Sequence, residues 1–408
     1  MAIKKVIESV KPGDEIFFPD GTYNIFGTWD SKSPKVQILI DKSRLIFRGE
    51  SEEGVIIKSN LNDPHDYNKR YVMKLLGVHD IIISNLTFTS NWVKTFSTGT
   101  NQNNHKRGGP AYMIGIQSHD KAYAYNIYIE HVTVMKYSRY GIVVRGGSHD
   151  VVLRYCTALK ATDLGNGDAG YGFVIQGKKH STASENPFLN TVDDTYNCMI
   201  DSCTTKEPYI RYAVIRQYWT HNNLVTNCNF TSQLDAIDLH GEDEYNNEIS
   251  YNIIYNIERE SGKGIGNKGA EHDRSGPYNW IHHNTIIKCK KGITVQYGSD
   301  YQRIEENVIR DNIEYSNGYG IGLGKTISTL VIRNYIQNCT AKNFSALSFF
   351  HDQELVTENG EKETAGNVCF CKIIGNKFSK NMKKHINWDK KISQNDKNTI
   401  IIEDIGKD

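Results

Sequence analysis

Residues 280–287 read WIHHNTII, and this pattern of a short apolar strand, an Asn and a further apolar step returns along the chain. RIEENVI at 303–309 and LVIRNYI at 330–336 repeat it most clearly. Most copies lie 23 to 27 residues apart, and the others lie 32 to 47 residues apart. Each coil of a parallel β-helix needs three short strands and three turns, and one turn can lengthen freely. The repeat therefore predicts an all-β fold, a right-handed parallel β-helix (solenoid), in which the long steps mark the loops.

One residue of each copy is expected to lie at the same bend in every coil. Asn suits such a bend because it tolerates left-handed backbone geometry and its amide can hydrogen-bond to the next coil, about 4.8 Å away. Cys156, Cys203 and Cys228 directly follow the bend, so we expect them to stack inside as small reduced apolar residues. The residues assigned to the bend are Asn85, His131, Tyr155, Ser202, Asn227, Asn252, Asn284, Asn307, Asn334 and Asn376.

A second strand follows in most coils, with apolar residues at alternate positions. GIVVRGG at 141–147 and AIDLHGE at 236–242 are examples. Because side chains alternate across a strand, the residues between the buried ones face outward and form a column from coil to coil. In AVIRQYW at 213–219, either Arg216 or Gln217 can occupy this column. Its other predicted members are Arg145, Gln176, His240, Lys268 and Gln296.

The chain of 408 residues contains no stretch with the composition of a linker, so we expect a single domain over residues 1–408. A helix within residues 1–12 is expected to cap the open end of the solenoid and hide its strand edge, and residues 380–408 are expected to cap the other end. The apolar residues with helical spacing in the first segment are Ile3, Val6, Ile7 and Val10.

The charge balance argues against two classes of partner. The chain has 48 Lys and Arg against 47 Asp and Glu, a net charge of +1, so neither nucleic acid nor a membrane surface is expected to bind. No apolar run approaches the roughly 18–20 residues of a membrane span. The start MAIKKVIESV lacks the apolar core of a signal peptide, and we expect a secreted protein whose export signal has been removed.

The stretch DAIDLHGEDEYNNEISYN at 235–252 gathers titratable groups at the end of one outward strand. Asp238 and His240 lie two residues apart, so the carboxylate can orient or charge the imidazole. A lone surface His or Arg is usually structural, but together they indicate acid–base chemistry. Arg216, on the preceding coil, would bind a substrate carboxylate bidentately.

Metal binding and a wider substrate surface are further predictions for this region. Glu242 and Glu244, with Asp238, either hold Ca²⁺ or form a solvated turn, and no other cofactor is expected. Lys268 lies in a Gly-rich segment that lets the backbone approach a ligand or simply turn. The residues expected to line the substrate groove are Arg211, Tyr212, Gln217, His221, Arg145, Gln176, Arg274 and Gln296.

Three segments resemble known families. KPGDEIFFPDGTYN, near the N-terminus, is similar to the opening of secreted β-helical polysaccharide lyases. Residues 204–256 resemble the catalytic coils of family 6 polysaccharide lyases, the alginate lyases and chondroitinase B, with His240 where that family has an Arg and no clear Lys on the preceding coil. Residues 270–295 are similar to a strand of mannuronan C5-epimerases, with His272 and Asp273 matching. The resemblance implies chemistry on uronate polymers.

We therefore expect a polysaccharide lyase that cleaves alginate or a related acidic polymer by β-elimination. The reaction requires a group that neutralises the carboxylate, a base for the C5 proton and an acid for the departing O4. Arg216, with Arg211 or Lys268, would neutralise the carboxylate. His240 or Lys268 would be the base, and Tyr218 or Tyr212 the acid. The alternatives are a C5-epimerase or a hydrolase acting in the same groove, and a non-catalytic glycan-binding β-helix of a phage or cell surface.

Overall fold

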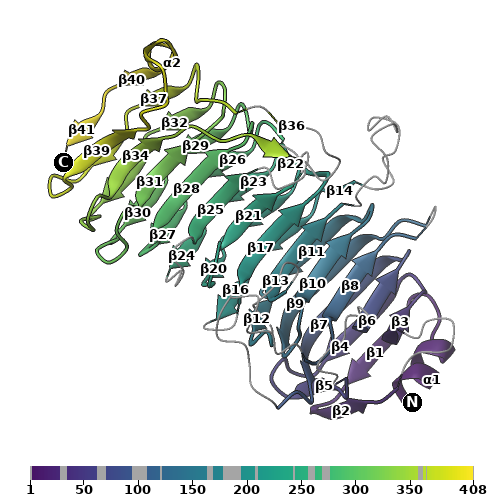
Figure 1. Cartoon of the computed structure of the whole chain (residues 1–408). Helices are drawn as coiled ribbons and strands as arrows, with labels where there is room; N and C mark the ends of the chain where they lie inside the picture. Colours follow the sequence, from purple (N-terminus) through teal and green to yellow (C-terminus); the bar gives the residue numbers. More distant parts are fainter. Residues whose placement is uncertain are drawn as a thin grey trace. The chain divides into compact units, whose positions relative to one another are not determined.

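The computed structural model describes residues 2–27, 35–61, 70–93, 108–119, 122–162, 169–177, 194–206, 210–241, 244–255, 262–268, 276–356, 362–363 and 365–407. The chain divides into two compact units, Met1–Val214 (unit 1) and Ile215–Asp408 (unit 2). In each unit parallel strands stack coil upon coil in a larger and a smaller sheet (Figure 1). The predicted fold, a parallel β-helix with an N-terminal helix, is confirmed. The prediction of a single domain stays a prediction.

Unit 1 begins with helix α1 (Ala2–Ser9). Its smaller sheet contains β3 (Val36–Ile40), β6 (Tyr71–Leu76), β8 (Tyr112–Gln117), β10 (Tyr140–Arg145) and β13 (Tyr171–Gln176). Strand β17 (Tyr212–Gln217) contains the division between the units. The larger sheet of unit 1 contains β1 (Glu15–Phe18), β2 (Gly21–Ile25), β4 (Leu45–Gly49), β5 (Val55–Ser59), β7 (His79–Ser90), β9 (Tyr125–Met135), β11 (His149–Arg154), β12 (Thr157–Leu159), β14 (Thr195–Tyr196), β15 (Met199–Asp201) and β16 (Thr204–Lys206).

Unit 2 repeats the arrangement. Its smaller sheet contains β21 (Ile237–His240), β25 (Lys263–Lys268), β28 (Lys291–Gln296), β31 (Tyr319–Leu323), β34 (Ser345–Phe349) and β39 (Lys384–Trp388). Its larger sheet contains β18 (Thr220–His221), β19 (Leu224–Thr226), β20 (Asn229–Phe230), β22 (Glu244–Tyr245), β23 (Glu248–Ser250), β24 (Ile253–Tyr255), β26 (Trp280–His282), β27 (Thr285–Ile287), β29 (Arg303–Glu305), β30 (Val308–Arg310), β32 (Leu330–Ile332), β33 (Tyr335–Gln337), β37 (Lys372–Ile374), β38 (Lys377–Phe378), β40 (Ile401–Glu403) and β41 (Gly406–Lys407). An antiparallel pair, β35 (Leu355–Val356) and β36 (Lys362–Glu363), and helix α2 (Gln394–Asn398) complete it.

Helix α1 packs against β3 at the start of unit 1, as expected for a cap. Ile7 is buried, whereas Val6 is 42% exposed, so only part of the predicted apolar stripe faces the sheet. Lys42 Nζ donates at 2.7 to 3.1 Å to three carbonyls at the end of the helix, those of Ile7, Glu8 and Val10. These bonds satisfy carbonyls that a helix end leaves without an intrahelical partner.

The Asn pattern resolves into two adjacent columns, so the single predicted column is wrong from Asn252 onward. The bend residues have positive φ, as expected for Asn85 and Asn227, but in the next two coils they are Tyr251 and His283, one position before the Asn. The next residue points inward, and Asn252 and Asn284 are fully buried. The error arose because a bend and an inward position are neighbours in every coil and Asn suits both.

In unit 2 the inward column is an unbroken chain of hydrogen bonds. The backbone N–H and Nδ2 of each Asn donate to Oδ1 of the next at 2.9 to 3.0 Å, from Asn252 through Asn284, Asn307 and Asn334 to Asn376. Each Nδ2 also donates to a backbone carbonyl, as Asn307 does to Ile281 at 2.9 Å. Buried amides are stable only when their hydrogen bonds are made, and this ladder makes them repeatedly.

Cysteines occupy the same inward column in earlier coils. Cys228 N–H donates to Asn252 Oδ1 at 3.0 Å, and Cys156, Cys203 and Cys228 are all buried and free of disulfides. Burial raises the pKa of the Cys156 thiol well above its ordinary value, which makes it a poor nucleophile. The prediction that these cysteines are reduced packing residues is confirmed.

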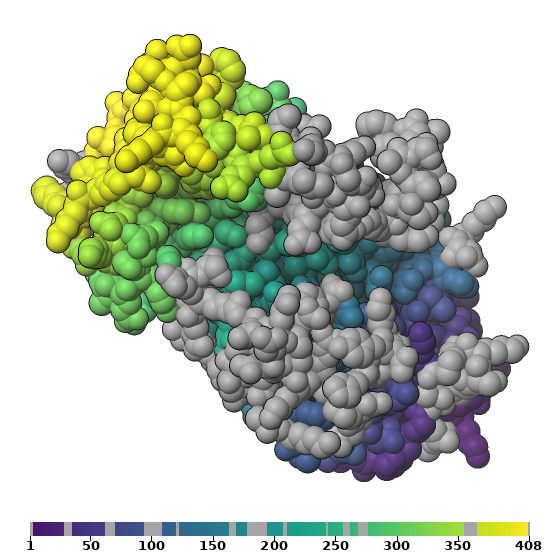
Figure 2. Space-filling view, viewed as in Figure 1, coloured from purple at the N-terminus to yellow at the C-terminus, as the bar shows by residue number. Residues whose placement is uncertain are grey.

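The last residues of the chain, drawn in yellow, form an exposed surface of unit 2 (Figure 2). Strand β39 pairs with β34, while β40 and β41 extend the larger sheet beyond β37 and β38. Helix α2 has no buried residue. Neither helix in the described part of the chain is long and apolar enough to cross a membrane.

Removing one rung of the Asn ladder should destabilise unit 2. Asn307→Ala would remove the side-chain bond to the Ile281 carbonyl and leave the Asn284 backbone N–H without its acceptor, while Asn284 Nδ2 would keep its bonds to the Ile249 and His282 carbonyls. We expect a loss of about 2–5 kcal/mol, since each buried unsatisfied group costs roughly 1–3 kcal/mol. The melting temperature, followed by circular dichroism, measures the effect. Asn398→Ala, in exposed α2, is the control, and equal melting temperatures for the two variants would contradict a stabilising role of the ladder.

Candidate active site

The smaller sheet aligns the predicted outward residues within each unit. In unit 2, His240 pairs with Lys268, and Lys268 pairs with Gln296. In unit 1, Arg145 pairs with Gln176. The register predicted from alternation is therefore confirmed for these two columns.

His240 lies beside a carboxylate that solvent cannot reach. Its Nδ1 lies 3.2 Å from Asp238 Oδ2, and the two side chains are 27% and 0% exposed. Both residues point to the outer side of the sheet, but the expectation that Asp238 is open to solvent is wrong. It can act on a substrate only through His240. The pair thus consists of an accessible imidazole with a buried carboxylate behind it, an arrangement that can stabilise the charged form of the ring.

A glycine on the next coil makes room for this carboxylate. Asp238 pairs with Gly266, and a Cβ at position 266 would lie 2.8 Å from Asp238 Oδ1. The same Cβ would come within 3.3 Å of Asp235 Oδ2 and 3.5 Å of Lys263 Cδ. The predicted Gly-rich segment therefore admits side chains from neighbouring positions, rather than a ligand, at residue 266.

Asp235 and Lys263 complete this polar cluster, and the sequence analysis assigned neither of them. Lys263 donates its backbone N–H to Asp235 Oδ1 at 2.8 Å, and its Nζ lies 3.4 Å from Oδ2. Both side chains are almost fully buried, at 10% and 1% exposure. A buried carboxylate needs such compensation. The sequence signal for this pair was the motif DAID, in which a second Asp, Asp235, lies three residues before Asp238.

An unusual turn places Tyr218 next to Gly241, the residue after His240. Tyr218 and Trp219 both have positive φ, at 57° and 44°. The Tyr218 N–H donates to Glu244 Oε1 at 2.7 Å, and a Cβ at Gly241 would lie 3.1 Å from Tyr218 Cδ1. The ring therefore packs over Gly241, the residue after His240. The predicted phenol thus lies next to the residue that follows the predicted imidazole.

Glu244 serves this turn and is itself inaccessible. Its side chain is fully buried, and the role predicted for Glu244 as a Ca²⁺ ligand stays a prediction. Glu242 lies outside the described residues. Among the residues that the structure describes, no group of three or more His, Cys, Asp or Glu side chains is arranged to hold a metal ion. A calcium site that includes Glu242 stays a prediction.

Arg216 faces the interior of unit 2, so its predicted contact with a substrate carboxylate is wrong. It is fully buried, and its Nη2 donates at 3.3 Å to the carbonyl of Glu248, a residue of the larger sheet. Alternation then turns Gln217 to the outer side, which decides between the two residues. Gln217 is 5% exposed. The local sequence could not reveal this register, because AVIRQYW is polar at both candidate positions.

The other predicted residues lie on several surfaces. His221 belongs to the larger sheet, where its ring stacks on Tyr245 at 4.7 Å. Gln296 Nε2 lies 3.4 Å from Asp352 Oδ1, so part of its hydrogen bonding is used within the protein. Arg274, His272 and Asp273 lie outside the described residues, and the side chain of Lys268 is also not described.

In unit 1 a ladder of tyrosines covers the outer side of the smaller sheet. The rings of Tyr71, Tyr112, Tyr140, Tyr171 and Tyr212 follow one another at 4.4 to 5.2 Å, each from a successive strand. Tyr212 is 5% exposed, and Arg211 Cζ lies 5.4 Å from the centre of its ring. Sequence analysis missed this ladder, although a Tyr opens each of these strands.

Cations accompany the tyrosine ladder. Burial raises the pKa of Tyr71, and a hydrogen bond with Arg145 opposes that shift. Burial, and the charge of Arg145, lower the pKa of Lys74, whose Nζ lies 5.1 Å above the Tyr71 ring. Arg145 is therefore packed among rings, where it can pair with an anion that reaches this surface.

The comparisons agree with this architecture. A family model described as "Right handed beta helix region" matches residues 115–309. A search of curated proteins found no match. The predicted right-handed form is confirmed over the matched region.

Solved structures with the same fold include enzymes and a phage protein. A PL6 family polysaccharide lyase from Pseudopedobacter saltans covers 100% of this chain and 90% of its own, with 12% identity and a TM-score of 0.63. The match to the periplasmic alginate epimerase AlgG covers 100% of this chain and 88% of the epimerase, with 14% sequence identity and a TM-score of 0.59. The match to the pre-mature gene product 12 of bacteriophage phi29 covers 96% of this chain and 48% of the phage protein, with 11% sequence identity and a TM-score of 0.67.

At these identities the likeness concerns the fold alone. The resemblance to family 6 lyases and to C5-epimerases that the sequence suggested is confirmed at that level. Because one fold serves unrelated functions, the chemistry has to be argued from the site.

Gly266 can be tested as the residue that makes room for Asp238. Gly266→Ala should force the Asp238 carboxylate away from its position and lower the free energy of unfolding by about 1–3 kcal/mol, as overpacking does. The His240 imidazole resonances should move in the same variant. Thermal melting and NMR of labelled His measure the two effects. Gly406→Ala, whose Cβ would have only Lys377 Cγ nearby at 3.9 Å, is the control. Unchanged stability and unchanged resonances in Gly266→Ala would refute the packing argument.

Proposed function

We propose that this protein cleaves an acidic, uronate-containing polysaccharide such as alginate by β-elimination. One observation carries the proposal: His240 is accessible with buried Asp238 at 3.2 Å, on an outward column that continues with Lys268 and Gln296, and the Tyr218 ring lies against Gly241, the next residue. A linear polymer can lie along such a column, because successive coils repeat at about 4.8 Å.

The elimination is divided among three groups. His240 removes the C5 proton of the uronate, and Asp238 stabilises the imidazolium that forms. The electron pair of the C5–H bond forms the C4–C5 double bond while the C4–O4 bond breaks. Tyr218 gives its proton to O4 of the leaving sugar. The reaction produces one unsaturated chain end and one new hydroxyl, with no net change in protons.

The substrate carboxylate needs a positive partner during proton removal, since negative charge develops next to it. Arg216 is unsuitable because it is buried and bonded to the Glu248 carbonyl. Lys268, the backbone partner of His240, is the proposed replacement. A Ca²⁺ ion bound with the help of Glu242 would supply the same neutralisation. The chain would act after export, where such polymers occur.

C5 epimerisation is the second candidate, because it begins with the same proton removal. The overall likeness to an alginate epimerase supports it at the level of fold. Hydrolysis is disfavoured: its acid and base carboxylates must both reach the sugar, whereas Asp238 and Glu244 are fully buried. A purely structural β-helix has no need of an exposed imidazole backed by a buried carboxylate.

The product of the reaction separates these functions. Incubation of the full chain with alginate, polygalacturonate or hyaluronan should produce ultraviolet absorbance from the new double bond conjugated to the carboxylate. Epimerisation would instead change the sugar composition, measured by proton NMR, without cleaving the chain. Dextran, a neutral polymer, is the control. No absorbance with any acidic polymer would refute the lyase.

His240→Ala should lower kcat by roughly two to four orders of magnitude, the usual contribution of an acid–base group. Tyr218→Phe should lower kcat without a comparable change in KM, since the phenol is needed only when O4 departs. His385→Ala, an imidazole near the C-terminus, should leave both constants unchanged. Full activity of His240→Ala would move the active site elsewhere.

A further inference from the structure

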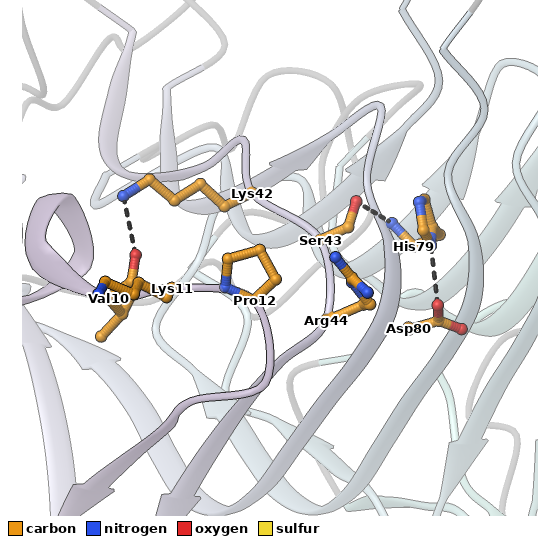
Figure 3. Close-up of a pocket in the computed structure, with 8 residues that line it drawn as sticks. All are labelled: Val10, Lys11, Pro12, Lys42, Ser43, Arg44, His79 and Asp80. Atoms are coloured by element: carbon orange, nitrogen blue, oxygen red, sulfur yellow. Dashed lines mark hydrogen bonds and ion pairs between the residues drawn. The ribbon is translucent and has the colours of Figure 1, made fainter.

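Unit 1 contains a cavity of about 610 Å³ that the proposed reaction does not use (Figure 3). It is lined by residues 10–12 after α1, residues 42–44 before β4 and residues 79–80 at the start of β7. Its volume falls within the roughly 300–1,000 Å³ typical of ligand pockets. It lies along the larger sheet, whereas the proposed catalytic column lies on the smaller sheet.

The charges around this cavity favour an anion. Lys11, Lys42 and Arg44 line it, and Asp80 is the only carboxylate among the lining residues. Lys42 is already bonded to the helix carbonyls. Lys11 and Arg44 are exposed, so both can approach a ligand. A charged ligand with a carboxylate suits the planar fork of Arg44.

Asp80 is occupied by neighbours within the protein. His79 Nδ1 lies 2.9 Å from Asp80 Oδ2, and Asn126 Nδ2 donates to Oδ1. The hydrogen bonds from His79 and Asn126 lower the pKa of Asp80, so it remains ionised. The single negative charge of Asp80 faces three positive charges, those of Lys11, Lys42 and Arg44, so the lining remains positive.

The cavity also presents a flat ring. The His79 ring stacks on Tyr125 at 4.8 Å, and the stack continues through His149 to Tyr196 at 5.3 and 4.8 Å. Strand β7 lies between β4 and β9, so the face of His79 that does not contact Tyr125 is turned toward the coil of Arg44. Figure 3 shows the Arg44 side chain between the Pro12 ring and the His79 ring in this view.

We propose that this cavity is a second binding site for a uronate unit of the acidic polysaccharide. The apolar face of the sugar ring packs on His79 and Pro12, and its carboxylate pairs with Arg44 and Lys11. A bare phosphate or sulfate would leave the ring faces unused, whereas a uronate uses both features. The identity of the ligand rests on the proposed function. A contact in this cavity adds to the affinity of the protein for the polymer and takes no part in the reaction at His240.

Arg44→Asn tests the site with little risk to the fold. Arg44 has φ of 61°, a conformation that Asn tolerates well. Lys288→Asn is the matched control, because Lys288 is exposed, has φ of 57° and lies in unit 2. Lys11→Ala is a second pocket variant at an exposed position outside any strand.

The measurement is retardation of the full chain in native gels that contain alginate, polygalacturonate or dextran, together with turnover of a uronate trisaccharide. We expect Arg44→Asn and Lys11→Ala to weaken the affinity for the acidic polymer by about 3- to 10-fold each, as loss of one charge-assisted contact does. Turnover of the trisaccharide should match the wild type, and Lys288→Asn should behave as the wild type in both assays.

Each outcome separates the binding site from the catalytic proposal. If the wild type cleaves and is retarded, but the pocket variants are retarded equally, the second site is refuted and the lyase stands. If retardation depends on Arg44 but nothing is cleaved, the site stands and the lyase is refuted. If the wild type neither binds nor cleaves any of the acidic polymers, both proposals fail. Equal retardation by dextran would also overturn the site, since a neutral polymer has no carboxylate for Arg44.

Discussion

Each coil of this protein must hydrogen-bond to the coils on either side of it, and this constraint fixes nearly everything else within each unit. Successive strands lie about 4.8 Å apart, so residues at equivalent positions are stacked directly on one another. Inside unit 2 the constraint also applies to side chains, since each Asn of the column from Asn252 to Asn376 hydrogen-bonds to the Asn of the next coil. A substitution at one position therefore alters the hydrogen bonds and packing of its neighbours in the same column.

The candidate active site follows from the same stacking. His240 is accessible because it ends a short strand, and Asp238 is buried because the next coil has Gly266 beneath it. Lys263 from that coil then compensates Asp235. A polar cluster in a solenoid thus needs matching choices on at least two coils: a small residue on one makes room for a charged residue on the other. Tyr218 joins the cluster through a turn with two successive residues of positive φ.

The fold sets what kinds of ligand suit the protein, and individual columns decide the chemistry. A parallel β-helix offers long rows of outward side chains, which suit linear polymers, and proteins similar to this one in fold include a lyase, an epimerase and a phage protein. The His240 cluster supports the lyase among these. The cavity beside α1, in unit 1, adds a different feature, a ring face with the two exposed cations Lys11 and Arg44.

The sequence by itself determined the parallel β-helix, the N-terminal helix, the inward cysteines and the columns of Arg145 with Gln176 and His240 with Lys268 and Gln296. All of these depend on local periodicity, that is, on the alternation of side chains along a strand and the repeat from coil to coil, both of which can be read from the sequence. Tertiary structure alone decided that Arg216 points inward, that Asp238 is closed off from solvent and that Asn252 begins a column one residue away from the bend. The physical reason is that burial and register at these positions depend on residues of the adjoining coils, such as Gly266 and Glu248, which the local pattern does not contain.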